Sequence, residues 1–211
     1  MEKNTSIATL QLLGGHPSLD FANTVSARRG RWGPDLLLGF DDLLAWADRV
    51  GLLGEAELDR LRRAAALSPQ ESVAALERAK RLREAVYGVF SALAAGAEPP
   101  AGALKLVRKE YLQAQSSRAL SAREGTVAWE WPDEPDLNAV THRIAVHAVD
   151  LLTGPELRRV KECYGRDCGW LFFDNSRNAS RRWCSDADCG TLARVTRHRM
   201  RARARPSCEE P

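Results

Sequence analysis

Long hydrophobic runs are the first thing this sequence lacks. Its longest stretch without an acidic or basic residue, Asn4–Leu19, has only 16 residues and is interrupted by two glycines and a proline. A membrane-spanning helix needs about 20 apolar residues, so no transmembrane segment is predicted. The first residues, Met1–Asn4, are not the basic segment followed by an apolar one that marks a secretory signal. We therefore expect a cytoplasmic protein without a membrane partner.

Motifs of enzyme active sites are missing as well. The sequence has no nucleophile elbow, no glycine-rich phosphate loop, no His-Glu-x-x-His pair and no plausible catalytic triad. Apolar residues (44%) and charged residues (28%) are close to the average of soluble globular proteins, which argues against a disordered or collagen-like chain. The 211 residues suffice for one ordinary domain and a small second one. The sequence predicts a globular protein that is not an enzyme.

Cysteine is absent before position 163, and all five cysteines follow. Four form two pairs of the same spacing, Cys163-x4-Cys168 and Cys184-x4-Cys189, with fifteen residues between the pairs. Reduced cysteines clustered in a cytosolic protein indicate metal ligands, and four thiolates make a closed tetrahedral site for one structural Zn²⁺. Two disulfides, four reduced core cysteines and an iron–sulfur cluster are the alternatives. Cys208 lies outside the pattern and is predicted to be a free thiol.

The residues around the cysteines predict the shape of this module. Apolar residues on both sides of the first pair indicate two short strands joined by a tight turn, Gly165–Gly169, and Cys189 is expected in the first turn of a C-terminal helix. Knuckle, hairpin and helix together predict a treble-clef-like zinc finger. About fifty residues bury little core, so the metal would supply much of the folding free energy.

The first 154 residues predict a mainly α fold. Apolar residues recur at helical spacing over 41–50, after Pro100 and over 137–151, and a capping box at Ser68–Glu71 opens a helix that ends at Gly96. Alternating residues over 120–131 predict a small β-hairpin. Gly154 and Pro155 mark a boundary. We expect a helical domain at 1–154, the finger at 155–205 and a tail at 206–211.

Positive charge is concentrated at the C-terminal end. The net charge is +3, whereas residues 175–205 hold nine Arg and two Asp. Such a basic end on an otherwise slightly acidic chain indicates a polyanion partner, here double-stranded DNA. A solvated basic face, charge balance for the zinc thiolates, and an Arg181 or Arg182 pair with Asp174 are the alternatives. The predicted nucleic-acid contacts, one side of the C-terminal helix and the loop before Cys184, are Arg194, Arg197, Arg201, Arg177, Arg181 and Arg182.

Two segments resemble a known pair of domains. The run Cys168–Asn178, followed by Arg181–Cys184, closely resembles the CGNR zinc-finger family, and Leu19–Thr24 (Leu-Asp-Phe-Ala-Asn-Thr) resembles a motif near the start of its N-terminal partner, the ABATE domain. The family's name motif is Cys-Gly-Asn-Arg, but Thr191-Leu192 follow Cys189-Gly190 here. The resemblance implies a bacterial transcription regulator whose helical domain senses a small ligand.

Asp20 and Asn23 are polar residues within an apolar stretch, and we predict that they contact an effector. The alternative is that they cap a helix and bind nearby backbone amides. Two other functions compete with DNA binding: a protein-interaction module stabilised by zinc, and an RNA-binding module. Because a single short finger usually gains affinity by pairing, a homodimer is a further expectation.

Overall fold

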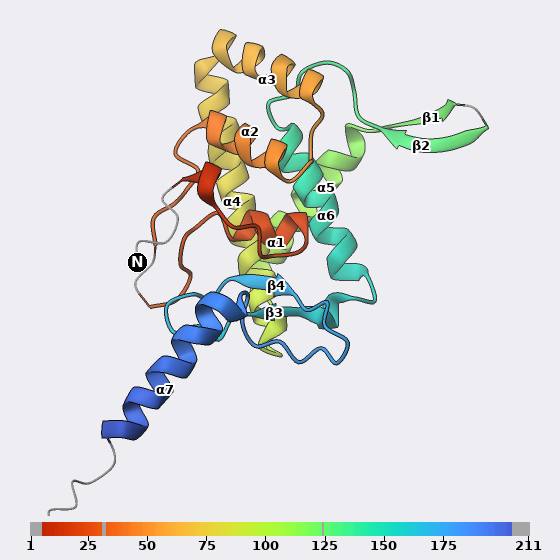
Figure 1. Ribbon diagram of the computed structural model, residues 1–211. Coiled ribbons are helices and arrows are strands. Elements are labelled where there is room, and N and C mark those ends of the chain that lie inside the picture. The colour runs from red at the N-terminus through yellow and green to blue at the C-terminus, as the bar shows by residue number, and fades with distance from the viewer. Residues whose placement is uncertain (1–5, 31–32, 124, 204–211) are drawn as a thin grey trace, which may run out of the picture.

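The computed structural model describes residues 6–30, 33–123 and 125–203 (Figure 1). Arg205, Cys208 and the tail at 206–211 lie outside this range. Among the described residues, no helix combines the length and the apolar character needed to cross a membrane. Helices dominate the N-terminal part and a small sheet with four clustered cysteines follows, so the predicted fold class is confirmed.

Within its described residues, the N-terminal part contains one 3-10 turn and six α-helices. The long helix α4 runs through its middle and packs against α1, α2, α3, α5 and α6 (Figure 1). The aromatic rings of Phe21, Trp46 and Phe90 are fully buried in the shared core. The elements are η1 (Ile7–Thr9), α1 (Pro17–Ala22), α2 (Phe40–Arg49), α3 (Glu55–Leu67), α4 (Pro69–Ala94), α5 (Ala101–Ser116) and α6 (Ala139–Thr153).

The helix starts correct one detail of the prediction. Pro69 does begin α4, but the Ser68 side chain makes no cap hydrogen bond, so the capping box predicted there is wrong. A side-chain cap is found at another helix, α2. There Asp42 Oδ2 accepts hydrogen bonds from the backbone N–H groups of Leu38 (2.8 Å) and Gly39 (3.0 Å). The acidic group also lies in the first turn, where the helix dipole favours negative charge.

The predicted hairpin is present and extends away from the helices (Figure 1). Strands β1 (Ala119–Arg123) and β2 (Thr126–Glu130) pair antiparallel, with Leu120 opposite Trp129. The turn contains Gly125 at φ +78°, a left-handed conformation that glycine adopts without steric cost. Leu120, Val127 and Trp129 are exposed on it.

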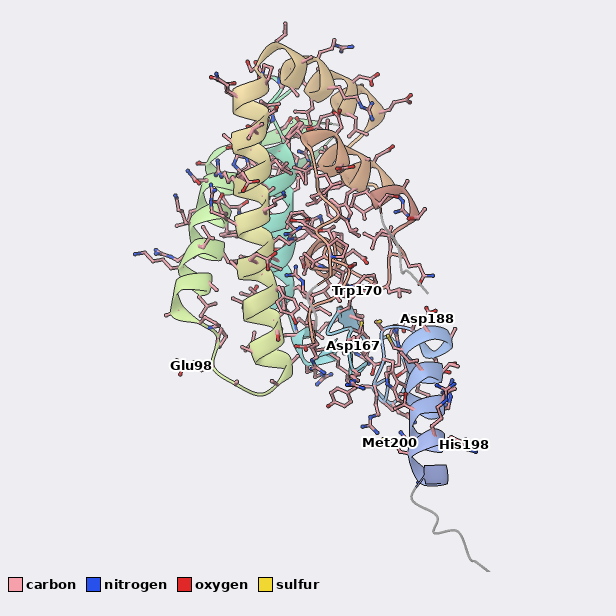
Figure 2. The ribbon with its side chains drawn as sticks, turned by 90° about the vertical axis from the view of Figure 1, so that its left-hand side faces the viewer. Glu98, Asp167, Trp170, Asp188, His198 and Met200 are labelled. Carbon is pink, nitrogen blue, oxygen red and sulfur yellow. The ribbon has the colours of Figure 1, made fainter. Side chains whose placement is uncertain are left out.

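The C-terminal part consists of η2 (Leu157–Arg159), β3 (Val160–Glu162), β4 (Leu171–Phe173), the helical turn η3 (Asp186–Gly190) and α7 (Thr191–Arg203). Strands β3 and β4 pair antiparallel and pack against α4, and β4 also packs against α1. Leu171 and Phe172 are fully buried in the same core as the N-terminal helices. Helix α7, in contrast, projects outward (Figures 1 and 2). The division into domains at 154 stays a prediction, since the two parts share one core.

Candidate metal centre and nucleic-acid interface

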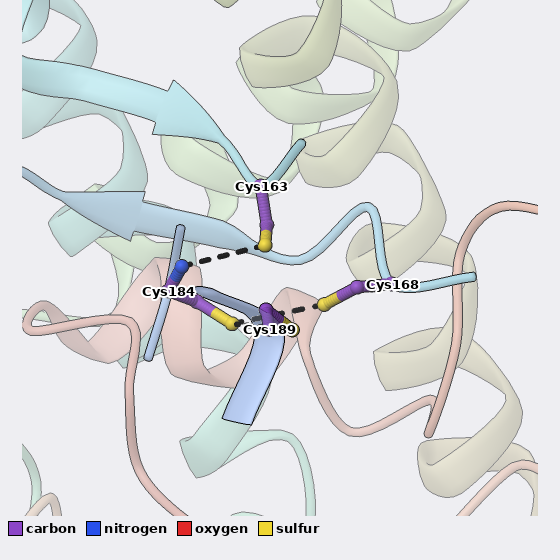
Figure 3. Close-up of side chains that lie close together, drawn as sticks. All are labelled: Cys163, Cys168, Cys184 and Cys189. Atoms are coloured by element: carbon purple, nitrogen blue, oxygen red, sulfur yellow. Dashed lines mark hydrogen bonds between the residues drawn. The ribbon is translucent and has the colours of Figure 1, made fainter. Parts of the chain in front are cut away.

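The four predicted cysteine ligands meet in one buried cluster. The sulfur atoms of Cys163, Cys168, Cys184 and Cys189 all lie within 4.8 Å of one another (Figure 3). Two of the sulfur–sulfur distances are 3.7 Å, between Cys168 and Cys184, and 3.9 Å, between Cys184 and Cys189. Four tetrahedral Zn–S bonds of about 2.3 Å place the sulfur atoms about 3.8 Å apart. The spacing therefore fits one zinc ion.

Glycines and backbone amides shape this cluster. The backbone N–H groups of Gly165 and Cys184 each point to Cys163 Sγ at 3.4 Å. A Cβ atom on Gly165 would lie 2.9 Å from Cys168 Cβ and 3.1 Å from Cys189 Sγ. Any larger residue there would push Cys168 and Cys189 apart, one ligand from each cysteine pair. The tight turn predicted between Gly165 and Gly169 thus brings two sulfur atoms to one point, with Gly169 at φ +68°.

The chemistry of the donor set also indicates a metal. Hydrogen bonding to Cys163, together with burial, raises the pKa of Cys168 and of Cys184. A divalent cation among the four sulfur atoms would reverse that direction and hold them as thiolates. Four protein ligands would leave no coordination position for water or substrate, so the zinc is structural. One Zn²⁺ held by these cysteines is the cofactor of this chain.

Asn23 joins the finger to the helical part. Its side-chain Nδ2 donates to the backbone oxygen of Leu171 (2.8 Å), and its Oδ1 accepts from the backbone N–H of the same residue (2.9 Å). The amide thus pairs with β4 as a neighbouring strand would. Asn23 is 1% exposed and Leu171 is fully buried, so neither backbone group has access to water. Both hydrogen bonds between Asn23 and Leu171 therefore lie in the protein core.

Four more hydrogen bonds reinforce this junction, all of them to residues 168–173. Trp170 Nε1 donates to Val25 O (2.8 Å), and the backbone N–H of Arg28 donates to the oxygen of the ligand Cys168 (2.6 Å). The Tyr87 hydroxyl donates to Gly169 O (3.2 Å), and Phe173 N donates to Gly14 O (2.7 Å). The knuckle that holds the first two zinc ligands is therefore fixed to the helical part.

Asp20 has a different role from Asn23. Its Oδ1 accepts the backbone N–H of Gly14 at 2.7 Å and its side chain is buried. Burial raises the pKa of Asp20 to about 6, although the backbone N–H groups of Gly14, Gly15 and His16 act in the opposite direction. Both predicted effector residues thus bind the chain's own backbone, as the alternative describes. Effector contact by Asp20 and Asn23 stays a prediction.

The six predicted arginine contacts fall into two groups. In the first, the guanidinium groups of Arg181 and Arg194 hold the finger itself: Arg181 donates to Phe173 O (3.2 Å) and Cys184 O (2.9 Å), and Arg194 forms an ion pair with Asp186 (2.9 Å). In the second, Arg182 lies over the Tyr164 ring, and no carboxylate among the described residues pairs with it or with the remaining three. Those three are exposed and are Arg177, Arg197 and Arg201.

The predicted alternative of an arginine pair with Asp174 involves another cation. Asp174 Oδ2 accepts from Lys161 Nζ at 2.7 Å and from the backbone N–H of Arg181 at 2.9 Å. Burial alone would raise the pKa of Asp174, but Lys161 and Ser176 together with these backbone contacts lower it. Lys161 therefore makes the ionic contact. Sequence reasoning missed it because Lys161 of β3 and Asp174, which follows β4, come together only when the two strands pair.

Comparison with known protein families gives two matches. Residues 15–155 match the ABATE family, described as “Putative stress-induced transcription regulator”, and residues 159–202 match the CGNR zinc finger. Neither description is that of an enzyme. No curated protein matches the sequence. Both family matches agree with the resemblance noted above from Leu19–Thr24 and from the residues around the cysteines.

Proposed function

Because the chain belongs to the ABATE family of transcription regulators and carries a CGNR zinc finger, we propose that it regulates transcription by binding double-stranded DNA through α7. The observation that carries this proposal is the projecting basic helix. Every side chain from Arg194 to Arg201 is exposed, and α7 packs substantially against η3 alone among the described elements. At 13 residues it is about 20 Å long, which suits the major groove.

Arg197 and Arg201 are the side chains that we assign to the DNA. They lie four residues apart on one side of the helix, and no carboxylate among the described residues pairs with either. A planar guanidinium grips phosphate or guanine with two parallel hydrogen bonds. Arg194 belongs to the same face, but its charge is shared with Asp186, so its contribution is smaller. Arg177 and Arg182 would extend this surface along the backbone.

The departure from the family motif lies at the base of α7. Thr191 Oγ1 donates to Asp186 O (3.2 Å) and accepts from Arg194 Nη2 (3.0 Å), so this residue helps to join η3 to the helix. Leu192 is 57% exposed. Since neither residue offers a cation, we propose that the DNA contacts are made further along the helix, at Arg197 and Arg201.

Selection of genomic duplex fragments by the zinc-loaded protein tests the proposal. The parent is expected to enrich a defined sequence, and the Arg197→Ala/Arg201→Ala variant is expected to lose that enrichment. Arg63→Ala/Arg81→Ala removes the same charge from exposed positions of α3 and α4 and should behave like the parent. About five phosphate contacts give a log–log salt slope near −4.5. A flat salt response contradicts the electrostatic part.

Two other outcomes support competing functions. Tighter binding to folded RNA than to any duplex would indicate an RNA-binding module. No nucleic-acid binding at moderate salt would indicate a protein-interaction module, which the exposed apolar side chains Leu192, Val195 and Met200 of α7 favour. The proposed regulator is a cytoplasmic homodimer with an effector site. Sedimentation of the zinc-loaded protein would measure its association.

A further inference from the structure

A pocket of about 590 Å³ lies where the end of α4 meets the finger. Its walls combine Arg29 and Ala95 of the helical part with Glu162, Tyr164 and Arg182 of the finger. We propose that this pocket binds a phosphate-bearing small molecule of mononucleotide size, and that this molecule is the effector. The role of this molecule as an effector rests on the proposed regulatory function. Its binding to the pocket does not depend on DNA.

The charge of the pocket selects an anion. Of its acidic and basic side chains, Arg29 pairs with Glu162 at 2.5 Å, and Lys161, which also lines it, pairs with Asp174 at 2.7 Å. Both pairs are neutral as units. Two further basic residues, Arg181 and Arg182, line the same pocket and have no carboxylate partner among the described residues. They leave an excess of positive charge.

The shape of the cation site favours phosphate over a simple ion. Arg181 is fixed by its hydrogen bonds to two backbone oxygens, and Arg182 is stacked 5.1 Å above the Tyr164 ring and 5.8 Å from the Trp183 ring. A guanidinium held in place, as that of Arg182 is, can bind a phosphate with two parallel charge-assisted hydrogen bonds. The half-exposed ring of Tyr164 adds an apolar surface for an organic group.

The size of the pocket suits a small organic molecule. Small-molecule sites occupy about 300–1,000 Å³, and this pocket lies in the middle of that range. A mononucleotide, with one phosphate and one planar ring, fills such a volume. Inorganic phosphate would occupy only the cationic end, and we expect it to bind more weakly than a nucleotide.

The position of the pocket connects a bound ligand to the zinc site. The backbone N–H of Tyr164 donates to Arg182 O at 3.0 Å, and these two residues lie one and two positions from the zinc ligands Cys163 and Cys184. On the other wall, Glu162 accepts a hydrogen bond from Ser91 of α4. A ligand held by Arg182 therefore contacts a segment that is hydrogen-bonded to Tyr164, and each of the two segments contains a zinc ligand.

Phosphate reaches this pocket from one of two sources, a free small molecule or the DNA backbone, and titration separates them. The zinc-loaded full chain is titrated calorimetrically, in the absence of DNA, with adenosine 5′-monophosphate, adenosine and inorganic phosphate. We expect binding of the monophosphate, weaker binding of phosphate, and none of adenosine. A parallel titration uses a duplex that the parent binds.

Two matched pairs of variants locate the site. Arg182→Gln should weaken binding of the monophosphate at least tenfold, whereas Arg81→Gln, at an exposed position of α4 outside the pocket, should leave it unchanged. Ala95→Glu adds a negative charge inside the pocket without removing any side-chain contact, and should also abolish binding. Ala97→Glu makes the same change just outside it. Zinc stoichiometry and thermal unfolding verify that each variant folds. If Arg182→Gln does not fold, the Ala95→Glu and Ala97→Glu pair tests the site.

Three results would overturn the proposal. The first is no heat from the monophosphate at millimolar concentration, and the second is equal affinity in each variant and its control. The third is a loss of duplex affinity in Arg182→Gln without any monophosphate binding, which would assign the pocket to a backbone phosphate. If duplex binding fails in every form while the monophosphate binds, the DNA-binding function is wrong and the pocket stands.

Discussion

The metal centre and α7 are adjacent in sequence and opposite in packing. Cys163, Cys168, Cys184 and Cys189 are buried, and residues 169–171 are hydrogen-bonded to Tyr87 of α4 and to Asn23 and Val25, which follow α1. Helix α7 begins two residues after Cys189, and every side chain from Arg194 to Arg201 is exposed. The finger thus has an anchored half, the four cysteines with β3 and β4, which packs on the helical part. Its free half is α7, and the anchored half determines the direction in which α7 projects.

Replacement of a zinc ligand should have the largest effect. Cys184→Ser removes one of four thiolates, and because the finger shares its core with the helices, we expect the free energy of unfolding to fall by more than about 4 kcal/mol. Zinc stoichiometry and chemical denaturation measure this. Cys208→Ser, outside the described residues, is the matched control and should retain one zinc ion. If the helical part of Cys184→Ser unfolds at the same denaturant concentration as in the parent, the finger does not share its stability with the helices.

Asn23→Ala tests the anchor from the other side. The change leaves the backbone N–H and oxygen of Leu171 buried without their partner, which costs about 2–4 kcal/mol. Zinc should still bind with a stoichiometry of one, but chelators should remove it faster. Asn178→Ala, at an exposed position of the finger, should change neither quantity. Unchanged stability of the Asn23 variant would contradict the contact that joins the two parts.

The stability of the protein should also respond to pH through His16, which lies at the start of α1. Burial, and then the charge of His147, lower the pKa of His16 from 6.5 to about 4, so the unfolded state binds more protons between these values. The free energy of unfolding should therefore decrease as the pH falls from 6.5 to about 4, by about 1–3 kcal/mol from this group. Asp20, whose pKa is raised to about 6, acts in the opposite direction as the pH falls.

Comparison of the parent with His16→Asn isolates the histidine, because Asp20 is present in both proteins. The variant should lose less stability than the parent over this pH range when denaturation is followed by circular dichroism. His198→Asn, at an exposed position of α7, is the matched control and should follow the parent. Parallel curves for the parent and His16→Asn would exclude His16 as a source of acid sensitivity.

The smallest effect on stability belongs to α7. Arg197→Ala/Arg201→Ala should change the free energy of unfolding by less than about 0.5 kcal/mol, since both side chains are exposed. Arg181→Ala removes the same residue type from the anchored half and should cost about 1–2 kcal/mol, because two backbone oxygens lose their donor. Equal costs in the two variants would remove the distinction between anchor and free surface.

Local patterns predicted much of this molecule. The paired spacing of the cysteines indicated the zinc site, and helical periodicity indicated α2, α4, α5 and α6, since ligands and apolar faces a few residues apart are set by local geometry. Helices α1 and α3 were not predicted. The bond between Asn23 and Leu171 left no such signal, because its partners are 148 residues apart. The position of Asn23 in an apolar stretch indicated a polar contact but did not identify the partner. The Lys161–Asp174 pair and the Arg194–Asp186 pair likewise depend on the folded backbone.

The bond between Asn23 and Leu171 has a consequence for synthesis on the ribosome. Asn23 is made early and Leu171 late, so α1 and the loop after it await a partner strand while most of the chain emerges. Contacts of such long sequence separation form slowly, since loop closure must precede them. The helical core is therefore completed only after the finger has been synthesised. In a chain that stops before β4, Asn23 has no Leu171 backbone to bind.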